Sequence, residues 1–131
     1  MQKSAIRRER RANRRTLRTT LRTRAAGNRL ASSCRRRPRS LATVALAAGV
    51  TKDAAAGVAN GLRSVAKRIG LAPAATARTR RTVAGGRARG TRSVTRWTLA
   101  QVARLVAAYK PRKAEYKTAV VLLAAFAGGA A

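Results

Sequence analysis

The sequence contains no histidine, and its acidic residues are only Glu9, Asp53 and Glu115, which lie far apart along the chain. General acid–base catalysis needs His or paired carboxylates, and protein metal sites need clusters of His, Cys, Asp or Glu. A Ser/His/Asp triad is excluded for the same reason. We therefore expect a protein that is not an enzyme and that has no catalytic residues, no metal site, no cofactor and no small-molecule substrate.

Cysteine is equally scarce, because Cys34 is the only one, so no disulfide can form within the chain. Three Arg follow Cys34 directly, and nearby positive charge favours a reactive thiolate. The simpler interpretation, which we prefer, is a small structural side chain.

Long apolar runs are also missing. The longest covers residues 119–131, only 13 residues, and Gly128 and Gly129 interrupt it. A helix needs about 20 apolar residues to cross a bilayer. We expect no membrane span.

Basic residues, by contrast, are abundant: 31 Lys and Arg against three acids give a net charge of +28. Such a surplus is typical of nucleic-acid-binding proteins. Duplex DNA carries one negative charge per ~1.7 Å, so this surplus matches the phosphates of about 14 base pairs per chain. A protein that coats or compacts DNA needs that many contacts, whereas a regulator of one site rarely does.

The positive charge is concentrated in residues 1–39, an arm in which Lys3 and fourteen Arg face Glu9 alone. Helical spacing places six Arg, from Arg7 to Arg22, on one stripe. Neighbouring Arg repel by roughly 0.2–0.5 kcal/mol per pair, so we expect the free arm to fray and to become helical on phosphates. The first helix is predicted from about residue 2 to 26, with a stop at Gly27-Asn28 and a second break at Pro38.

Residues 40–71 are rich in Ala, Val and Gly and leave two interpretations open. Ser40 and Thr51 can cap two helices, and Gly70 can end the second. Residues 44–59 are similar to a helix-turn-helix with Gly49 at the turn, although the start of its second helix offers few side chains that read bases. The preferred alternative is a close-packed pair of helices, or one bent helix.

Residues 72–96 contain seven Arg and no acid, together with Ala, Thr and Gly. This composition predicts a basic linker that follows phosphates through flexibility and charge. Part of it, residues 74–83, can also form a helix.

Residues 97–131 hold all four aromatic residues and predict a helical hairpin. Thr98 and Gln101 form a capping box, and Trp97 can pack on Val102 as a hydrophobic staple. Pro111 ends the first helix, and the second, from about residue 112 to 127, is apolar nearly all round. Its surplus face should pack on residues 41–70 or on another subunit. The predicted oligomer interface is Val120, Val121, Leu122, Leu123 and Phe126.

Two resemblances bear on function. The start Lys3-Ser4-Ala5-Ile6-Arg7-Arg8 is similar to the opening of a helical-bundle protein of the bacterial small ribosomal subunit, which implies a basic helix buried in RNA. The layout, from the arm to the hairpin of Trp97 and Phe126, resembles the small all-helical capsid proteins of filamentous and rod-shaped archaeal DNA viruses. That resemblance implies basic helices wrapped on duplex DNA and bundles stacked into a shell.

We thus expect an all-α protein, with a basic N-terminal helical arm and a small Ala-rich bundle that ends in a helical hairpin. The expected function is a structural coat on nucleic acid, mainly double-stranded DNA, that works without sequence specificity as a homo-oligomer in a virion or nucleoid. The alternatives are a helix-turn-helix regulator and an RNA-bound ribosomal or ribonucleoprotein component. The predicted nucleic-acid-binding residues are Arg7, Arg8, Arg11, Arg14, Arg15, Arg18, Arg22, Arg35, Arg36, Arg37, Arg39, Arg78, Arg80, Arg81, Arg87 and Arg89.

Overall fold

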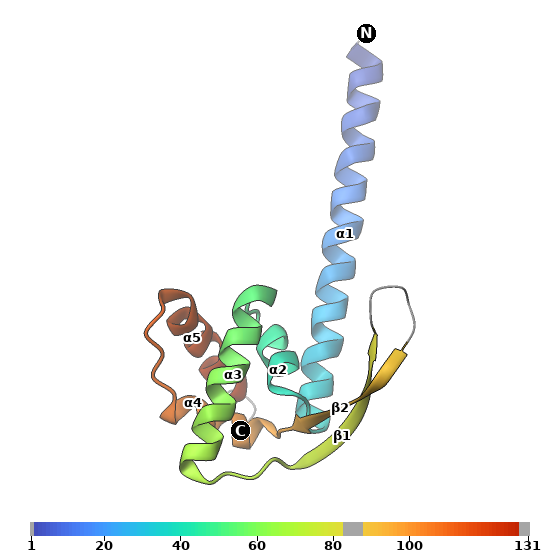
Figure 1. Ribbon diagram of the computed structural model, residues 1–131. Coiled ribbons are helices and arrows are strands. Elements are labelled where there is room, and N and C mark those ends of the chain that lie inside the picture. Colours follow the sequence, from blue (N-terminus) through green and yellow to red (C-terminus); the bar gives the residue numbers. More distant parts are fainter. Residues whose placement is uncertain (1, 83–87, 129–131) are drawn as a thin grey trace.

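A computed structural model describes residues 2–82 and 88–128, with side chains described outside residues 80–90. Most of the chain is helical, and a long helix projects from a small body that also carries a two-stranded sheet (Figure 1). The elements in chain order are α1 (Gln2–Arg36), α2 (Leu41–Ala47), α3 (Lys52–Ile69), β1 (Ala75–Thr82), β2 (Ala88–Arg96), α4 (Leu99–Ala108) and α5 (Ala114–Gly128).

Helix α1 is one continuous helix of 35 residues, so the predicted stop at Gly27-Asn28 is wrong. A glycine inside a helix costs only about 1 kcal/mol, which one full turn of hydrogen bonds on either side outweighs. Four Thr hydroxyls add local bonds: for example, Thr19 donates to the Arg15 carbonyl over 2.9 Å. The predicted break at Pro38 is confirmed, because α1 ends at Arg36.

Residues 41–69 form two helices, not one bent helix. The Ser40 side chain caps α2 by accepting from the Thr43 amide. Gly49, with φ at 94°, provides the left-handed residue of the four-residue turn that leads to α3. Thr51 occupies the N-cap position of α3, but its hydroxyl makes no capping bond, and Gly70 ends the helix as predicted.

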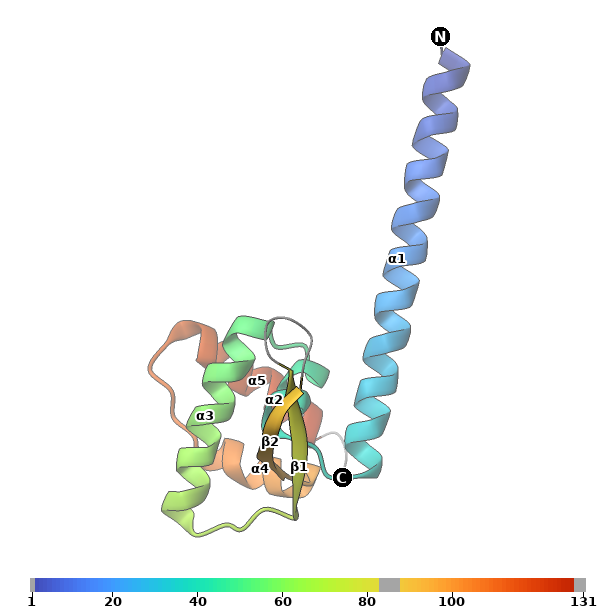
Figure 2. The same ribbon diagram turned by 45° about the vertical axis from the view of Figure 1, so that its right-hand side comes forward.

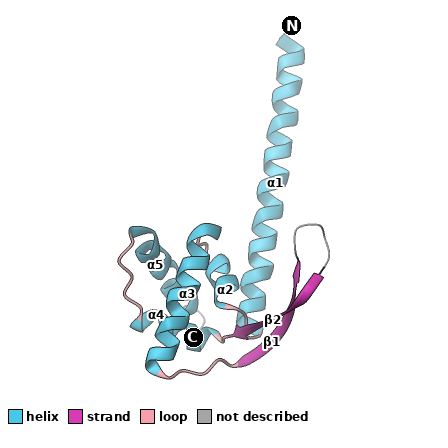
Figure 3. Cartoon of the chain, in the orientation of Figure 1, coloured by secondary structure: helices cyan, strands magenta, loops and turns pink. Residues whose placement is uncertain are grey.

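The segment predicted as a linker is instead an antiparallel β-hairpin, which corrects the all-α expectation to a mostly helical fold with a small sheet (Figure 3). The strand β1 also overturns the helical alternative for residues 74–83. The physical reason is the frequency of β-branched side chains: Thr76 faces Thr95 across the two strands, and Val94 faces Ala77.

A short backbone bridge connects the hairpin to the end of α1. Arg39 and Trp97 exchange two hydrogen bonds, of 3.0 and 2.8 Å, as an isolated antiparallel pair. The Trp97 indole is buried and donates to the Thr95 hydroxyl over 3.1 Å. Trp97 therefore lies where the arm, the hairpin and α4 meet.

The C-terminal helical hairpin is confirmed. Thr98 and Gln101 form the predicted capping box at the start of α4. Helix α5 begins two residues later than expected and packs on α4, α3 and α2. Its apolar side is thereby partly covered within the chain, where Ala119, Leu123 and Ala127 are buried.

Two glycines of α3 allow two tyrosine rings to lie directly against the helix. A Cβ added at Gly57 would lie 2.0 Å from the Tyr116 hydroxyl, and one at Gly61 would lie 2.5 Å from the Tyr109 hydroxyl. Both rings pack on the core, which argues against their use as a stacking platform for bases. The spacing of four residues places the two glycines on the same side of α3.

We expect Gly57→Ala to lower the free energy of unfolding by about 1–3 kcal/mol, because the new methyl group overpacks the Tyr116 contact. Helix propensity alone would raise it by about 1 kcal/mol. Gly27→Ala is the matched control, since a Cβ added at Gly27 would meet no described side chain within 4 Å. Chemical denaturation followed by circular dichroism measures both. Equal effects of the two substitutions would contradict this packing.

Candidate nucleic-acid interface

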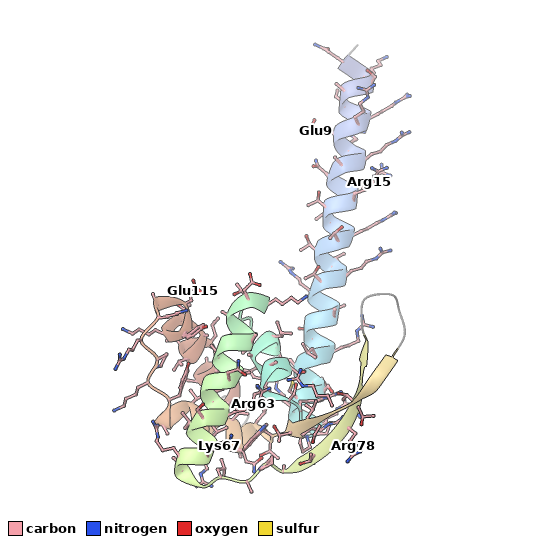
Figure 4. The ribbon with its side chains drawn as sticks, in the orientation of Figure 1. Glu9, Arg15, Arg63, Lys67, Arg78 and Glu115 are labelled. Carbon is pink, nitrogen blue, oxygen red and sulfur yellow. The ribbon has the colours of Figure 1, made fainter. Side chains whose placement is uncertain are left out.

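Most arginines of the arm lie on one side of an exposed helix. Every residue of α1 from Gln2 to Arg29 is exposed, a length of ~42 Å at 1.5 Å per residue. Thr16, Thr20 and Thr23 share a helical stripe with Cys34, which is buried in the body, so the opposite Arg stripe faces away from the core. Figure 4 shows Glu9 and Arg15 on opposite sides of α1, with Arg15 on the side where the hairpin lies.

The base of the arm is fixed to the body by side-chain contacts. The Arg35 guanidinium lies 5.7 Å from the centroid of the Phe126 ring, a cation–π contact. Arg39 donates to the Ser33 hydroxyl through Nε over 2.8 Å and through a second nitrogen. Arg35 and Arg39 thus have partners inside the chain, although Arg35 is exposed, as are Arg36 and Arg37.

Cys34 lies at the same junction and is buried. Burial raises the pKa of its thiol, and the smaller opposing effect of Arg39 does not reverse the shift. The structure thereby favours the small structural side chain over a reactive thiolate.

Helix α3 carries a polar ridge that the sequence analysis missed. Asn60, Ser64 and Lys67 are exposed, on the side of the helix opposite to the buried Val58 and Leu62. The similarity to a helix-turn-helix covered only residues 44–59 and so left these three residues out, although Gly70 was predicted to end the helix. The polar spacing of three and four residues beyond Ala59 is the signal that could have found the ridge.

Arg63 joins this ridge to the hairpin. It is partly exposed and donates to the Asn60 carboxamide oxygen over 2.7 Å. It also lines a shallow hollow of about 260 Å³ together with Arg92 of β2. Figure 4 shows Arg63 and Lys67 on α3 and Arg78 on β1 along the same face of the body.

Of the Arg predicted for residues 72–96, Arg78 is exposed on β1. The backbone of β1 includes Arg80 and Arg81, and that of β2 includes Arg89. Arg87 lies outside the described residues. Arg92, which the prediction left out, is exposed beside the ridge. The hairpin therefore brings Arg92 next to Arg63 of α3.

The predicted oligomer interface is only partly available to a partner. Val121 is 67% exposed and Leu122 is 37% exposed, while Val120 and Phe126 are partly buried. Leu123 is buried in the core of the same chain, where α5 meets the other helices. The apolar side chains left exposed on α5 include those of Val121, Leu122, Ala124 and Ala125.

Comparisons with protein-family models, with curated proteins and with solved structures found no match.

The described residues offer neither a membrane span nor a metal site. Among these residues, none of the helices combines the length and the apolar character needed to cross a membrane. The same residues contain no group of three or more His, Cys, Asp or Glu side chains arranged to hold a metal ion.

Proposed function

We propose that this protein binds double-stranded DNA through a helix-turn-helix unit, with the ridge of α3 facing the duplex and with the hairpin and the arm on the phosphates. The observation that carries the proposal is the exposed polar ridge of Asn60, Ser64 and Lys67, with Arg63 and Arg92 beside it. Amide, hydroxyl and cationic side chains are those that contact base edges and phosphates. A helix fits the major groove, which is about 12 Å wide.

The turn between α2 and α3 supports the same proposal. Four residues with a left-handed Gly49 connect the two helices, as in the helix-turn-helix motif. The far side of α3 packs on α2, α4 and α5, so the polar ridge is the side of α3 that is exposed to a ligand.

The arm supplies affinity rather than sequence preference. Arginine forms paired hydrogen bonds with phosphate oxygens, and such contacts do not distinguish sequences. The exposed length of α1, ~42 Å, corresponds to about 12 base pairs of a straight duplex at 3.4 Å per base pair.

Competition binding tests this function. A labelled random-sequence duplex of ~30 base pairs is bound by the protein, and unlabelled duplex DNA or structured RNA of equal phosphate number is added. We expect duplex DNA to be the stronger competitor, because A-form RNA has a deep, narrow major groove that an α-helix does not enter. Stronger competition by RNA would favour a ribonucleoprotein role instead.

A structural coat on DNA is the second candidate, favoured by the net charge of +28, which exceeds what one groove contact needs. A regulator must prefer its own site by about 10³-fold or more over random duplex. Selection of bound sequences from a random pool distinguishes the two. Regular filaments on linear DNA in electron micrographs, without an enriched sequence, would favour the coat.

A further inference from the structure

Helix α3 has two flanks, and only one of them is covered by the hairpin. In both ribbon views the hairpin lies on one side of α3, and the connection between α4 and α5 lies on the other (Figures 1 and 2). The residues that line the hollows agree with this placement. Arg63, Ala66 and Lys67 line hollows on the hairpin side, whereas Ser64 and Arg68 line one on the other side.

This second hollow, of about 740 Å³, lies between the C-terminal half of α3 and the end of α4. Arg68 and Lys110 provide its charge, and both side chains are exposed. Arg112 and Lys113 follow Lys110 in the short α4–α5 connection and are exposed as well. None of the three acids of the chain lines this hollow.

Arg68 is held in place by the body and still has free donors. One of its terminal nitrogens donates to the Ala108 carbonyl over 3.0 Å. A guanidinium carries five N–H groups, so most of them remain available to a ligand. The Lys113 ammonium lies 5.4 Å from the centroid of the Tyr116 ring, which fixes the far end of the connection.

We infer that Arg68 and Lys110 form a site that binds phosphates of the DNA backbone. In the proposed complex the hairpin contacts one DNA strand, and this site contacts the other. The inference rests on the proposed function, because a helix that fills the major groove has a phosphate row on each side. The two cationic flanks match these two rows, and the α4–α5 connection becomes the counterpart of the hairpin. The ligand of this site is a phosphate group of the DNA backbone.

The experiment compares two double variants, each of which removes one Arg and one Lys. Arg68→Gln with Lys110→Gln removes the proposed site. Arg104→Gln with Lys117→Gln is the matched control, because Arg104 and Lys117 are exposed and neither lines a hollow beside α3. Binding to a random duplex of ~30 base pairs is measured by fluorescence anisotropy at several salt concentrations.

For the site variant we expect the slope of log K against log salt to become shallower by ~1.8, since each lost phosphate contact removes ~0.9. At about 0.1 M salt this corresponds to a loss of affinity of at least tenfold. The control should leave the slope nearly unchanged. Lys110→Gln alone, a change at an exposed side chain, should give about half of the effect and guards against misfolding of the double variant.

The outcomes separate the inference from the function on which it rests. If the unaltered protein binds no duplex, the proposed function fails. If the unaltered protein binds duplex DNA and both double variants change the salt slope equally, Arg68 and Lys110 do not contact the duplex. The proposed DNA-binding function then still holds. Millimolar inorganic phosphate could instead raise the melting temperature of the unaltered protein but not that of the site variant, while the site variant and the control bind DNA equally. This result would assign the hollow to a free phosphate compound and contradict the contact with the DNA strand.

Discussion

Replacing the six arginines of the arm stripe by Gln should weaken binding to a random duplex by at least about 10³-fold near 0.1 M salt. The physical reason is the loss of up to six phosphate contacts, which should also make the salt slope shallower by about 5. The fold of the body should not change, because these side chains are exposed on a part of α1 that projects from it. The six positions are Arg7, Arg11, Arg14, Arg15, Arg18 and Arg22.

The opposite stripe of the arm provides the control for this prediction. Replacing Thr16, Thr19, Thr20 and Thr23 by Ala removes four hydroxyl bonds to backbone carbonyls and no charge. Affinity for the duplex should then change by less than about threefold, since the Arg stripe and its phosphate contacts remain. An equal loss in the Thr variant would mean that helicity of the arm, and not its charge, dominates binding.

Trp97→Ala should lower the free energy of unfolding by about 3–5 kcal/mol, the largest stability effect that we expect in this chain. The side chain is 3% exposed, and its removal leaves a cavity where the arm, the hairpin and α4 meet. Small domains are stable by only about 5–15 kcal/mol, so a large fraction of the variant should be unfolded under mild conditions. Urea denaturation followed by circular dichroism measures the change.

Trp97→Phe distinguishes the packing contribution from the indole hydrogen bond. Phe keeps most of the apolar volume and loses the bond to the Thr95 hydroxyl, so a cost of about 1 kcal/mol is expected. Val121→Ala, at a side chain that is 67% exposed, should change stability by less than about 0.5 kcal/mol. A Trp97→Ala cost as small as that of Val121→Ala would contradict the central position of Trp97.

Features that depend on neighbouring residues were predictable from the sequence. The capping box of Thr98 and Gln101 needs only a spacing of three residues, and Gly70 and Pro38 act on the backbone at their own positions. The buried side of α4 follows from the helical spacing of its apolar residues, and Val102 and Leu105 are indeed buried.

The hairpin was not predictable in the same way, because its stability depends on contacts distant in sequence. Residues 72–96 have no continuous apolar side, so their composition indicated a linker. The bridge between Arg39 and Trp97, which anchors the hairpin, joins positions that no local pattern connects. The sequence predicted a helix end at Gly27, a residue type of low helix propensity. The helical turns on both sides of Gly27 outweigh this local cost, so α1 continues through it.

The candidate site shows the same division. The Arg stripe of α1 could be deduced from helical spacing. The ridge of α3 was missed although the end of that helix was predicted, because which side of α3 stays exposed depends on how Val58 and Leu62 pack in the core. That Arg63 and Arg92 line one hollow depends on how the hairpin folds beside α3.

The salt dependence of binding tests the central claim most directly, namely that the positive surplus of the chain is neutralised by the backbone of a nucleic acid. The unaltered protein is titrated onto a random duplex of ~30 base pairs at salt concentrations from about 50 to 200 mM. We predict tight binding at the lowest salt and a slope of log K against log salt of about −7 or steeper, since the six Arg of the arm stripe together with Arg68 and Lys110 would make about eight phosphate contacts. A compact monomer that retains neither duplex DNA nor RNA at low ionic strength would contradict the account.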